Sequence, residues 1–483
     1  MAGLDINPDN VKIGKLNNDG SGTLINFWRG IENLTINSNM TWAVSQATFL
    51  RRVQINGNLS LSHTEPSSGG FIADALVKGD VNSGSQQQWF MRNSQFGSWT
   101  GGVFNMVFVG SNGTLPTNAT EGLYTKINNS DLVQEKPFLT FDKSAGYRVF
   151  VPATRNDSQG ISWGESAQGT YIPLSEFYVA HEDKDNSKTL NDALSQGKHL
   201  LFTPGVYKLD EPIVVSKENT IVMGMGLATL KVSDRNTDCL LKTADVGGII
   251  MSGLLFDAGK SSKTLLTLGE NKTQTSHAQN PVCLSDLFFR VGGATSATTS
   301  VDTCIKVNQN DVLGDNFWVW RADHTYGVGW TKNPCKTGIE VNGDNVTVYG
   351  LFVEHFLEYQ TIWNGENGTT YFYQCELPYD VPNQSRWKSH NGTTNGYSAY
   401  KVGDDVHTHT AYGMGIYSYL RDSGVRLENA IETPMSNGIY MKNIIIVWFV
   451  GHKDSGIDHV INGYGGSADD KTKNSRYLLY NPS

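Results

Sequence analysis

The chain has 483 residues, of which 18% are charged, and 38 basic and 47 acidic side chains give a formal net charge of -9. This length exceeds the size at which a single hydrophobic core usually stops growing, so we expect two lobes or a repeating architecture. The acidic balance without long single-sign runs argues against nucleic acid and an anionic membrane as partners, and it favours a neutral ligand.

The first part of the chain contains short apolar runs that are typical of strands. They occupy residues 42–44, 50–55 and 104–109, and Gly- and Asn-rich turns follow them. Residues 154–169 are rich in Ser, Asn and Gly and are predicted to be a linker. We therefore expect two β-helical lobes, formed by residues 1–165 and 166–483.

The second part repeats a unit of roughly twenty to thirty residues in which a strand-like run meets a Gly or Asn turn. Residues 201–207 and 212–215 resemble a first coil, and further runs lie at 248–257, 282–290, 338–349 and 438–445. Each run is too short to bury its own apolar face, so the units must stack. The sequence therefore predicts an all-β fold, a right-handed parallel β-helix of the pectate-lyase-like kind. Gly224 and Gly226 are more typical of a turn than of a dinucleotide loop, because no helix follows.

Several features indicate a secreted protein. Twelve Asn-x-Ser/Thr sequons start between Asn33 and Asn391, a number that suits a secretory glycoprotein. The longest apolar run, residues 444–450, is far shorter than the roughly 18 residues needed to cross a bilayer. The five cysteines include no CxxC pair, which leaves one or two disulfides open and at least one thiol free as a small buried side chain.

Acids, amides and aromatic residues are densest between residues 316 and 383. Glu354 and Glu376 are separated by 376 − 354 = 22 residues, close to one coil, so the second could lie on the strand above the first. Two stacked carboxyl groups do not both ionise easily. One would keep a proton for a glycosidic oxygen while the other helps to activate water, as glycoside hydrolysis requires.

Aromatic residues flank this pair, as is common in carbohydrate sites. They are Trp318, Trp320, Tyr359, Tyr371, Tyr373 and Tyr379, of which about half would be core residues by this interpretation. Without these neighbours, two glutamates on successive strands would more often be plain exposed polar residues. Asp404, Asp405, His407 and His409 match no metal-ligand spacing, so we expect no metal and no cofactor.

This stretch resembles the C-terminal β-helix of glycoside hydrolase family 55, the β-1,3-glucanases. The resemblance rests on Trp320, Ala322-Asp323-His324, Glu354-His355, Tyr359-Gln360, and Gln374 with Glu376-Leu377-Pro378-Tyr379. It implies a two-lobed enzyme acting with inversion, with Glu376 as general acid and Glu354 in the network that activates water. Trp320, Asp323, His324, His355, Tyr359, Gln360, Gln374 and Tyr379 would then bind substrate.

The N-terminal part resembles the family in a Gln-Gln-aromatic element that precedes Arg92-Asn93. The family implies that a glutamine of this element holds the attacking water, so Gln87 and Gln88 are both candidates. This lobe looks abbreviated beside those of family members, which are longer. We expect the active site in the cleft where the lobes meet.

We expect a monomeric, secreted hydrolase whose partner is a neutral polysaccharide such as β-1,3-glucan. Two alternatives share the same fold. Arg321, Lys401 and Arg421 could serve a polysaccharide lyase, but such an enzyme wants an acidic polymer and usually calcium, which an acidic chain does not favour. A non-catalytic carbohydrate-binding or cell-surface protein is the other.

Overall fold

The computed structural model describes residues 5–6, 10–13, 23–28, 30–63, 65–164 and 167–482. The chain forms two compact units, Met1–Leu174 and Ser175–Ser483. The predicted boundary at residues 165 and 166 lies outside the described residues. Strands dominate both units and pair mostly in parallel, which confirms the predicted parallel β-helix.

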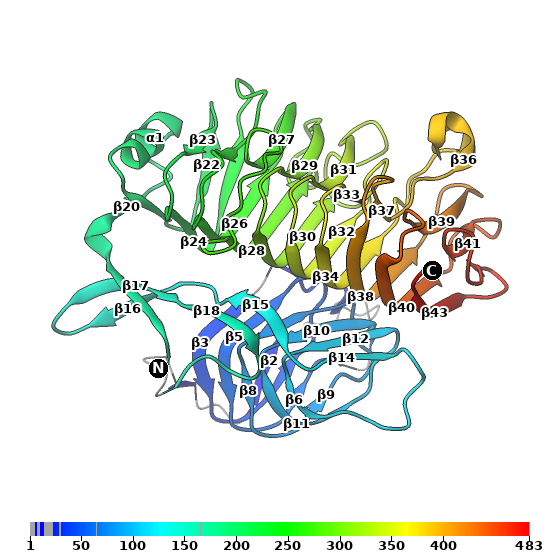
Figure 1. Ribbon diagram of the computed structural model, residues 1–483, viewed down its shortest axis with the longest axis horizontal. Helices are drawn as coiled ribbons and strands as arrows, with labels where there is room; N and C mark the ends of the chain where they lie inside the picture. Colours follow the sequence, from blue (N-terminus) through cyan, green and yellow to red (C-terminus); the bar gives the residue numbers. More distant parts are fainter. Residues whose placement is uncertain are drawn as a thin grey trace. The chain divides into compact units, whose positions relative to one another are not determined.

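The N-terminal unit stacks short parallel strands around an apolar core (Figure 1). Trp42, Trp89 and Trp99 fill this core with at most 1% of their surface exposed, because alternate residues of each strand point inward. The parallel strands are β1 (Asp5–Ile6), β2 (Asn10–Ile13), β3 (Gly30–Ile36), β4 (Asn39–Trp42), β5 (Phe49–Ile55), β6 (Leu59–Ser60), β7 (Phe71–Ala73), β8 (Leu76–Val77), β9 (Val81–Asn82), β10 (Gln88–Arg92), β11 (Gln95–Thr100), β12 (Asn105–Val109), β13 (Asn112–Thr114) and β14 (Tyr124–Ile127).

Antiparallel strands follow this stack, which the sequence analysis did not predict. β15 (Ser130–Gln134) pairs with β18 (Thr154–Ser158), while β17 (Gly146–Pro152) lies between β16 (Phe138–Asp142) and β19 (Gly169–Pro173). The linker prediction for residues 154–169 was therefore wrong at its start, where β18 lies. The polar side chains of this segment are typical of a loop. The hydrogen bonds to β15, however, are made by backbone groups, which every residue type carries.

A buried ion cluster ties the segment after β15 to the parallel stack. Arg92 holds Glu135 through two hydrogen bonds of 2.6 and 2.8 Å, and Arg51 lies 3.8 Å from the same carboxylate. Burial alone would raise the pKa of Glu135, but the charges and hydrogen bonds of the arginines outweigh it and lower that pKa to about 2. The cluster is thus charged and paired at neutral pH.

The C-terminal unit is a longer solenoid with two stacked sheets (Figure 1). The long sheet contains β20 (Phe177–Ala180), β21 (His199–Phe202), β22 (Val206–Leu209), β24 (Ile221–Val232), β26 (Ile250–Asp257), β28 (Val282–Val291), β30 (Val312–Arg321), β32 (Thr347–Glu354), β34 (Gly368–Glu376), β38 (Thr408–Ser418), β40 (Gly438–Trp448) and the antiparallel β43 (Asn474–Tyr480). The short sheet contains β23 (Ile213–Val215), β25 (Leu241–Thr243), β27 (Ser262–Leu268), β29 (Val301–Val307), β31 (Cys335–Val341), β33 (Thr361–Trp363), β37 (Tyr400–Val402), β39 (Arg426–Glu432), β41 (Gly456–Ile461) and the antiparallel β42 (Ala468–Asp469).

Few other elements interrupt the coils. The helix α1 (Ser187–Ser195) begins at Asn186, whose side chain caps the first turn. A small hairpin of β35 (Lys388–Ser389) and β36 (Thr394–Asn395) leaves the solenoid between β34 and β37. The 3-10 turns are η2 (Leu174–Glu176), η3 (Gln384–Arg386) and η4 (His390–Gly392). No helix among the described residues is long and apolar enough to span a membrane.

Turns after the short-sheet strands stack as regularly as the strands. Asn364 donates a hydrogen bond to Asn342, which donates to Asn308, at 2.8 and 2.9 Å. A Cβ on Gly365 would collide with the carbonyl oxygen of Gly343 in the coil before it, so the close stacking requires glycine. These Asn-Gly turns are the repeats visible in the sequence.

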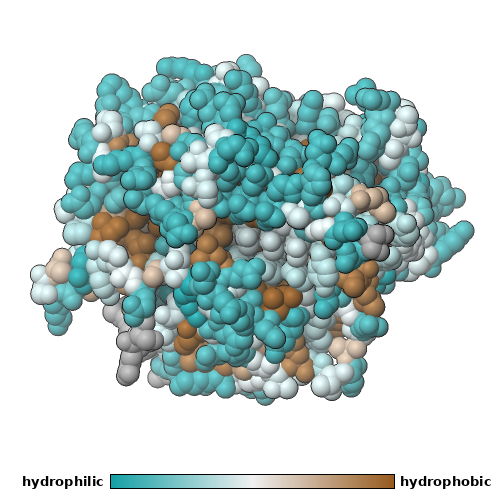
Figure 2. All heavy atoms as spheres, in the orientation of Figure 1, coloured by the Kyte–Doolittle hydropathy of each residue, from teal (hydrophilic) through white to brown (hydrophobic). Residues whose placement is uncertain are grey.

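Hydrophilic side chains cover most of the face shown in Figure 2.

The cysteines are small buried side chains of the solenoid. All five are free and buried, so the disulfides left open above are absent from the structure. Burial raises the pKa of the Cys239 and Cys283 thiols to about 12, which makes both poor nucleophiles at neutral pH.

Candidate active site

Glu354 and Glu376 end two neighbouring strands of the long sheet. They are direct register partners in β32 and β34, as the spacing of 22 residues predicts, and Trp320 in β30 is the next partner of Glu354. Their chain neighbours Val353 and Cys375 fill the solenoid core. Because side chains alternate along a strand, both carboxyl groups project from the outer face of the sheet, on strands about 4.8 Å apart.

Glu354 is the more deeply buried acid, with 1% of its surface exposed against 9% for Glu376. Trp318 donates a hydrogen bond to Glu354 through its indole nitrogen at 2.8 Å. Burial, and then the charge of Glu376, raise the pKa of Glu354 well above its ordinary value. Hydrogen bonds from Trp318 and Gln374 favour the charged form of Glu354, but burial and the neighbouring charge outweigh them. Glu354 therefore holds a proton more readily than an ordinary glutamate.

Glu376 is held by groups from its own loop and strand. The Tyr379 hydroxyl donates to Glu376 Oε2, and the amide nitrogen of Gln374 lies 3.3 Å from Oε1. The imidazole Nε2 of His355 is 3.9 Å from the same carboxylate, and its ring packs edge-on against Tyr379. Glu376 thus faces donors while keeping part of its surface accessible, an arrangement that suits proton exchange with a ligand.

A second acid, Asp323, organises the histidines around the pair. Its Oδ1 accepts hydrogen bonds from Trp320 at 3.2 Å and His324 at 2.9 Å, and lies 3.6 Å from His355 Nε2. Burial would raise the pKa of Asp323, but the charge of His355 and the hydrogen bond from His324 outweigh it and lower the pKa. Asp323 is therefore ionised, and it fixes the rings of three neighbouring side chains.

Arg321 lies beside this cluster and stabilises it. The sequence analysis considered Arg321 only as a catalytic residue of a polysaccharide lyase. Its buried guanidinium makes a bidentate pair with Asp380 at 3.1 and 2.9 Å and donates to the carbonyl oxygens of His355 and Asn333. Asp380 follows Tyr379, so one side chain braces the loops of both His355 and Tyr379. The sequence gives no sign of the roles of Arg321 and Asp380 except that both lie next to the motifs. Trp318 could be recognised, because it is two residues before Trp320 and therefore lies on the same face of the strand.

Replacing Arg321 by lysine should destabilise the protein and lower turnover together. Lysine keeps the charge but lacks the planar fork, so buried acceptors would lose their donors at a cost of about 1–3 kcal/mol. Chemical denaturation gives the free energy of unfolding, and kcat and KM give the effect on the site. Arg290→Lys is the matched control, because Arg290 pairs with Asp257 on β26 and β28 of the same sheet. Equal effects of both variants on kcat would contradict a supporting role specific to Arg321.

The structure brings together eight of the ten predicted site residues of this unit, and two lie elsewhere. Gln360 is fully buried, and its side-chain amide bonds to the backbone of Phe356 and Glu358. This amide closes a turn, and the substrate-binding role of Gln360 stays a prediction. Tyr359 packs against Tyr397 and lies 5.9 Å from Lys401, on the side of the short sheet.

The glutamines of the N-terminal unit have different surroundings. Gln86, which precedes the two predicted residues, bonds through its side chain to the backbone of Gly69, Val44 and Leu61. Gln88 is buried and donates to Ser68 at 3.1 Å, while its side-chain oxygen has no partner among the described residues. Gln87 is half-buried. The water-holding role of Gln87 or Gln88 stays a prediction.

Among the described residues, no group of three or more His, Cys, Asp or Glu side chains is arranged to hold a metal ion. His409, considered above as a ligand, is buried and lies 2.8 Å from the Tyr400 hydroxyl, and burial lowers its pKa to about 3. His407 lies 2.9 Å from Glu366 instead. Glu354 and Glu376 are close enough for the charge of one to affect the protonation of the other.

Comparison with known proteins places this arrangement in a family. Residues 177–376 match the LAM55 pectate lyase-like domain. An exo-beta-1,3-glucanase from Streptomyces sp. (strain SirexAA-E / ActE) is 43% identical over 481 residues, covering 96% of this chain and 77% of that protein. The structure of sacteLam55A from Streptomyces sp. SirexAA-E superposes with a TM-score of 0.92 at 40% identity, over 99% of this chain and 91% of the other. A sacteLam55A variant in complex with glucose also gives 0.92, at 41% identity over 99% and 88% of the two chains. The chain therefore belongs to glycoside hydrolase family 55, the β-1,3-glucanases.

Proposed function

We propose that this protein hydrolyses β-1,3-glucan with Glu376 as general acid and Glu354 as general base. The observation that carries the proposal is the register pairing of two buried glutamates beside Trp318 and Trp320. Such a pair supplies both proton transfers of glycoside hydrolysis, and the indole rings supply flat apolar surface for a sugar. The related Streptomyces protein is named an exo-beta-1,3-glucanase.

The proposed reaction moves one proton from Glu376 to the leaving sugar and a different proton from water to Glu354. Glu376 gives a proton to the glycosidic oxygen as the bond from that oxygen to C1 breaks. Water attacks C1 from the opposite face, and Glu354 takes the proton that the water releases. The reaction requires the arrangement in which Glu376 carries a proton and Glu354 is ionised. Gln374, which faces both carboxyl groups, suits either arrangement because its amide both donates and accepts.

We further propose that the enzyme removes glucose from chain ends, outside the cell. The exo mode rests on the name of the relative and the inverting course on the family. The extracellular location rests on the substrate, a polymer too large to enter a cell intact, and on the sequons of this chain.

Incubation with laminarin should release glucose from the first minutes, and its first anomer should be α. Inversion at C1 of a β-linkage gives this product, which proton NMR distinguishes before mutarotation mixes the anomers. Pustulan, pectin and an α-glucan are the controls and should release nothing. Initial β-glucose would contradict inversion, and early longer oligosaccharides would contradict the exo mode. No release from laminarin under any condition would overturn the proposed activity.

A further inference from the structure

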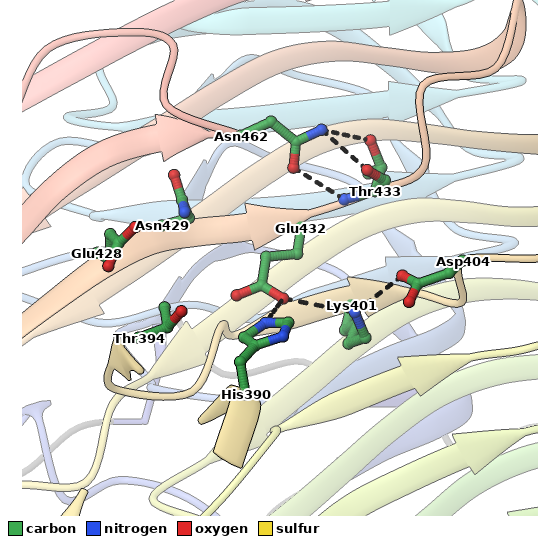
Figure 3. A pocket seen from close by; sticks show the side chains of 9 residues that line it. All are labelled: His390, Thr394, Lys401, Asp404, Glu428, Asn429, Glu432, Thr433 and Asn462. Atoms are coloured by element: carbon green, nitrogen blue, oxygen red, sulfur yellow. Dashed lines mark hydrogen bonds and ion pairs between the residues drawn. The ribbon is translucent and has the colours of Figure 1, made fainter. Parts of the chain in front are cut away.

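A second polar hollow lies on the outer face of the short sheet, near its C-terminal end (Figure 3). It encloses about 260 Å³, just below the range of roughly 300–1,000 Å³ typical of pockets for drug-sized ligands. Its lining includes His390, Lys401, Asp404, Glu428, Glu432 and Asn462. None of the residues that line it belongs to the Glu354–Glu376 cluster, so its polar groups need a separate account.

The floor of the hollow comes from neighbouring strands. Lys401 in β37 is the register partner of Ile362 in β33, and Lys401 and Glu432 are partners across β37 and β39. Both point outward, because their chain neighbours Tyr400, Val402 and Ile431 fill the core. The β35–β36 hairpin adds His390 and Thr394 as a wall. The groups thus rest on paired strands, which hold them more firmly than a loop would.

Glu432 is the centre of this hollow. One carboxylate oxygen, Oε2, lies 2.9 Å from His390 Nε2 and 3.5 Å from Lys401 Nζ (Figure 3). The other oxygen has no hydrogen-bond partner among the described residues, although only 9% of the residue surface is exposed. This oxygen stays accessible at the hollow, so it can accept a hydrogen bond from a molecule that enters.

Lys401 and the acids supply the polar groups around this oxygen. Asp404 orients the Lys401 ammonium at 3.2 Å. The Asn462 amide bonds to Thr433 and to the Tyr480 hydroxyl, so it shapes the wall of the hollow and its two amide hydrogens are already used. Three acids against Lys401 and His390 disfavour an anionic ligand, and the ammonium between Asp404 and Glu432 already fills the place of a cation. A neutral molecule with several hydroxyl groups satisfies both donors and acceptors. Tyr359, 5.9 Å from Lys401, adds an aromatic ring beside them.

A lysine–glutamate pair elsewhere on the same sheet shows what a plain surface pair looks like. Lys306 in β29 and Glu340 in β31 are register partners 3.3 Å apart, with side chains 35% and 23% exposed. The corresponding values for Lys401 and Glu432 are 17% and 12%. Burying a charged side chain more deeply is unfavourable unless hydrogen-bond partners compensate for the lost water. The difference shows that the hairpin residue His390 covers the Lys401–Glu432 pair and leaves a hollow beside it.

We propose that this hollow is a non-catalytic binding site for a neutral glucan chain, separate from the Glu354–Glu376 cluster. The proposal rests on the proposed β-1,3-glucanase function for the identity of the sugar. Its role would be to hold an insoluble glucan while the catalytic cluster works on free ends, which raises the effective concentration of ends.

The test uses the full chain and two probes, insoluble curdlan for binding and laminaritriose for hydrolysis. Glu432→Gln keeps the size of the side chain but removes its charge, and Thr394→Trp fills the hollow from the hairpin without touching a buried contact. Both should bind curdlan about tenfold more weakly, the usual scale for losing a charged hydrogen bond. Both should hydrolyse laminaritriose within about twofold of the wild-type kcat/KM. The matched control Glu340→Gln should change neither value.

Each outcome decides between the two proposals. Wild-type curdlan binding by both hollow variants would overturn the binding site, while hydrolysis of laminaritriose would still support the proposed activity. If the wild type hydrolyses no β-1,3-glucan but loses curdlan binding in both variants, the binding site stands and the catalytic proposal falls. A parallel loss of laminaritriose hydrolysis would show that the hollow belongs to the catalytic site, which would also overturn the proposal.

Discussion

Glu376→Gln should lower laminarin hydrolysis by roughly 10²–10⁴-fold, the range ascribed to general acid catalysis, while sugar binding survives. Glutamine keeps the size of the side chain and an acceptor for the Tyr379 hydroxyl, so the loop should stay in place. What it lacks is the proton that the leaving oxygen needs. Initial rates on laminarin and calorimetric binding of laminaritriose measure the two effects separately.

The leaving group distinguishes this role from a structural one. A substrate whose leaving group departs without a proton, such as an activated aryl β-glucoside, should recover most of the lost rate in Glu376→Gln. Glu358→Gln is the control, because Glu358 lies in the connection between β32 and β33 of the same unit, is more exposed and is 3.9 Å from Lys336. Equal losses on both substrates would mean that Glu376 acts through structure and not through its proton.

The pH dependence of the same variant tests the electrostatics of the pair. The charge of Glu376 is one cause of the raised pKa of Glu354. Removing that charge should lower the pKa of Glu354 toward its ordinary value, so Glu354 would ionise at lower pH. With the activated substrate, the rising limb of kcat/KM should therefore move to lower pH in Glu376→Gln. A rising limb that stays in place or moves to higher pH would contradict the electrostatic coupling between Glu354 and Glu376.

The coils could be predicted from the sequence because each coil of a solenoid contacts only its neighbours. Runs such as residues 338–349 carry both a strand and its Asn-Gly turn, and the stacking of Asn342 on Asn308 needs nothing from distant parts of the chain. The antiparallel strands β15–β19 lacked such a signal. Their place depends on partners such as Arg92 and Glu135, which are 43 residues apart and look like ordinary surface charges in the sequence.

The candidate site divides in the same way. A spacing of one coil was enough to predict that Glu354 and Glu376 stack, because register converts distance along the chain into contact. Spacing could not reveal which polar side chains already form hydrogen bonds with the backbone. Gln360 looks like a ligand-binding amide beside Tyr359, but both ends of its amide close a turn. The brace between Arg321 and Asp380 spans 59 residues and depends on the path of the loop after β34.

Glu354→Gln should also lower laminarin hydrolysis by roughly 10²–10⁴-fold, but no activated substrate should rescue it. Glutamine can still accept the hydrogen bond from Trp318, so the strand and the indole ring should keep their places. The attacking water, however, loses the group that takes its proton, and a better leaving group does not replace that group. Replacing a buried carboxyl by a neutral amide removes a group that is costly to ionise, so the variant should be as stable as the wild type or more stable.

The comparison of the two variants is the measurement that assigns the roles. Rates on laminarin and on the aryl glucoside should fall together in Glu354→Gln, whereas in Glu376→Gln only the laminarin rate should fall steeply. The reverse pattern would exchange the two roles, with Glu354 as the proton donor. The burial of Glu354 makes that reversal the informative alternative, because a carboxyl group with a raised pKa is suited to donate a proton.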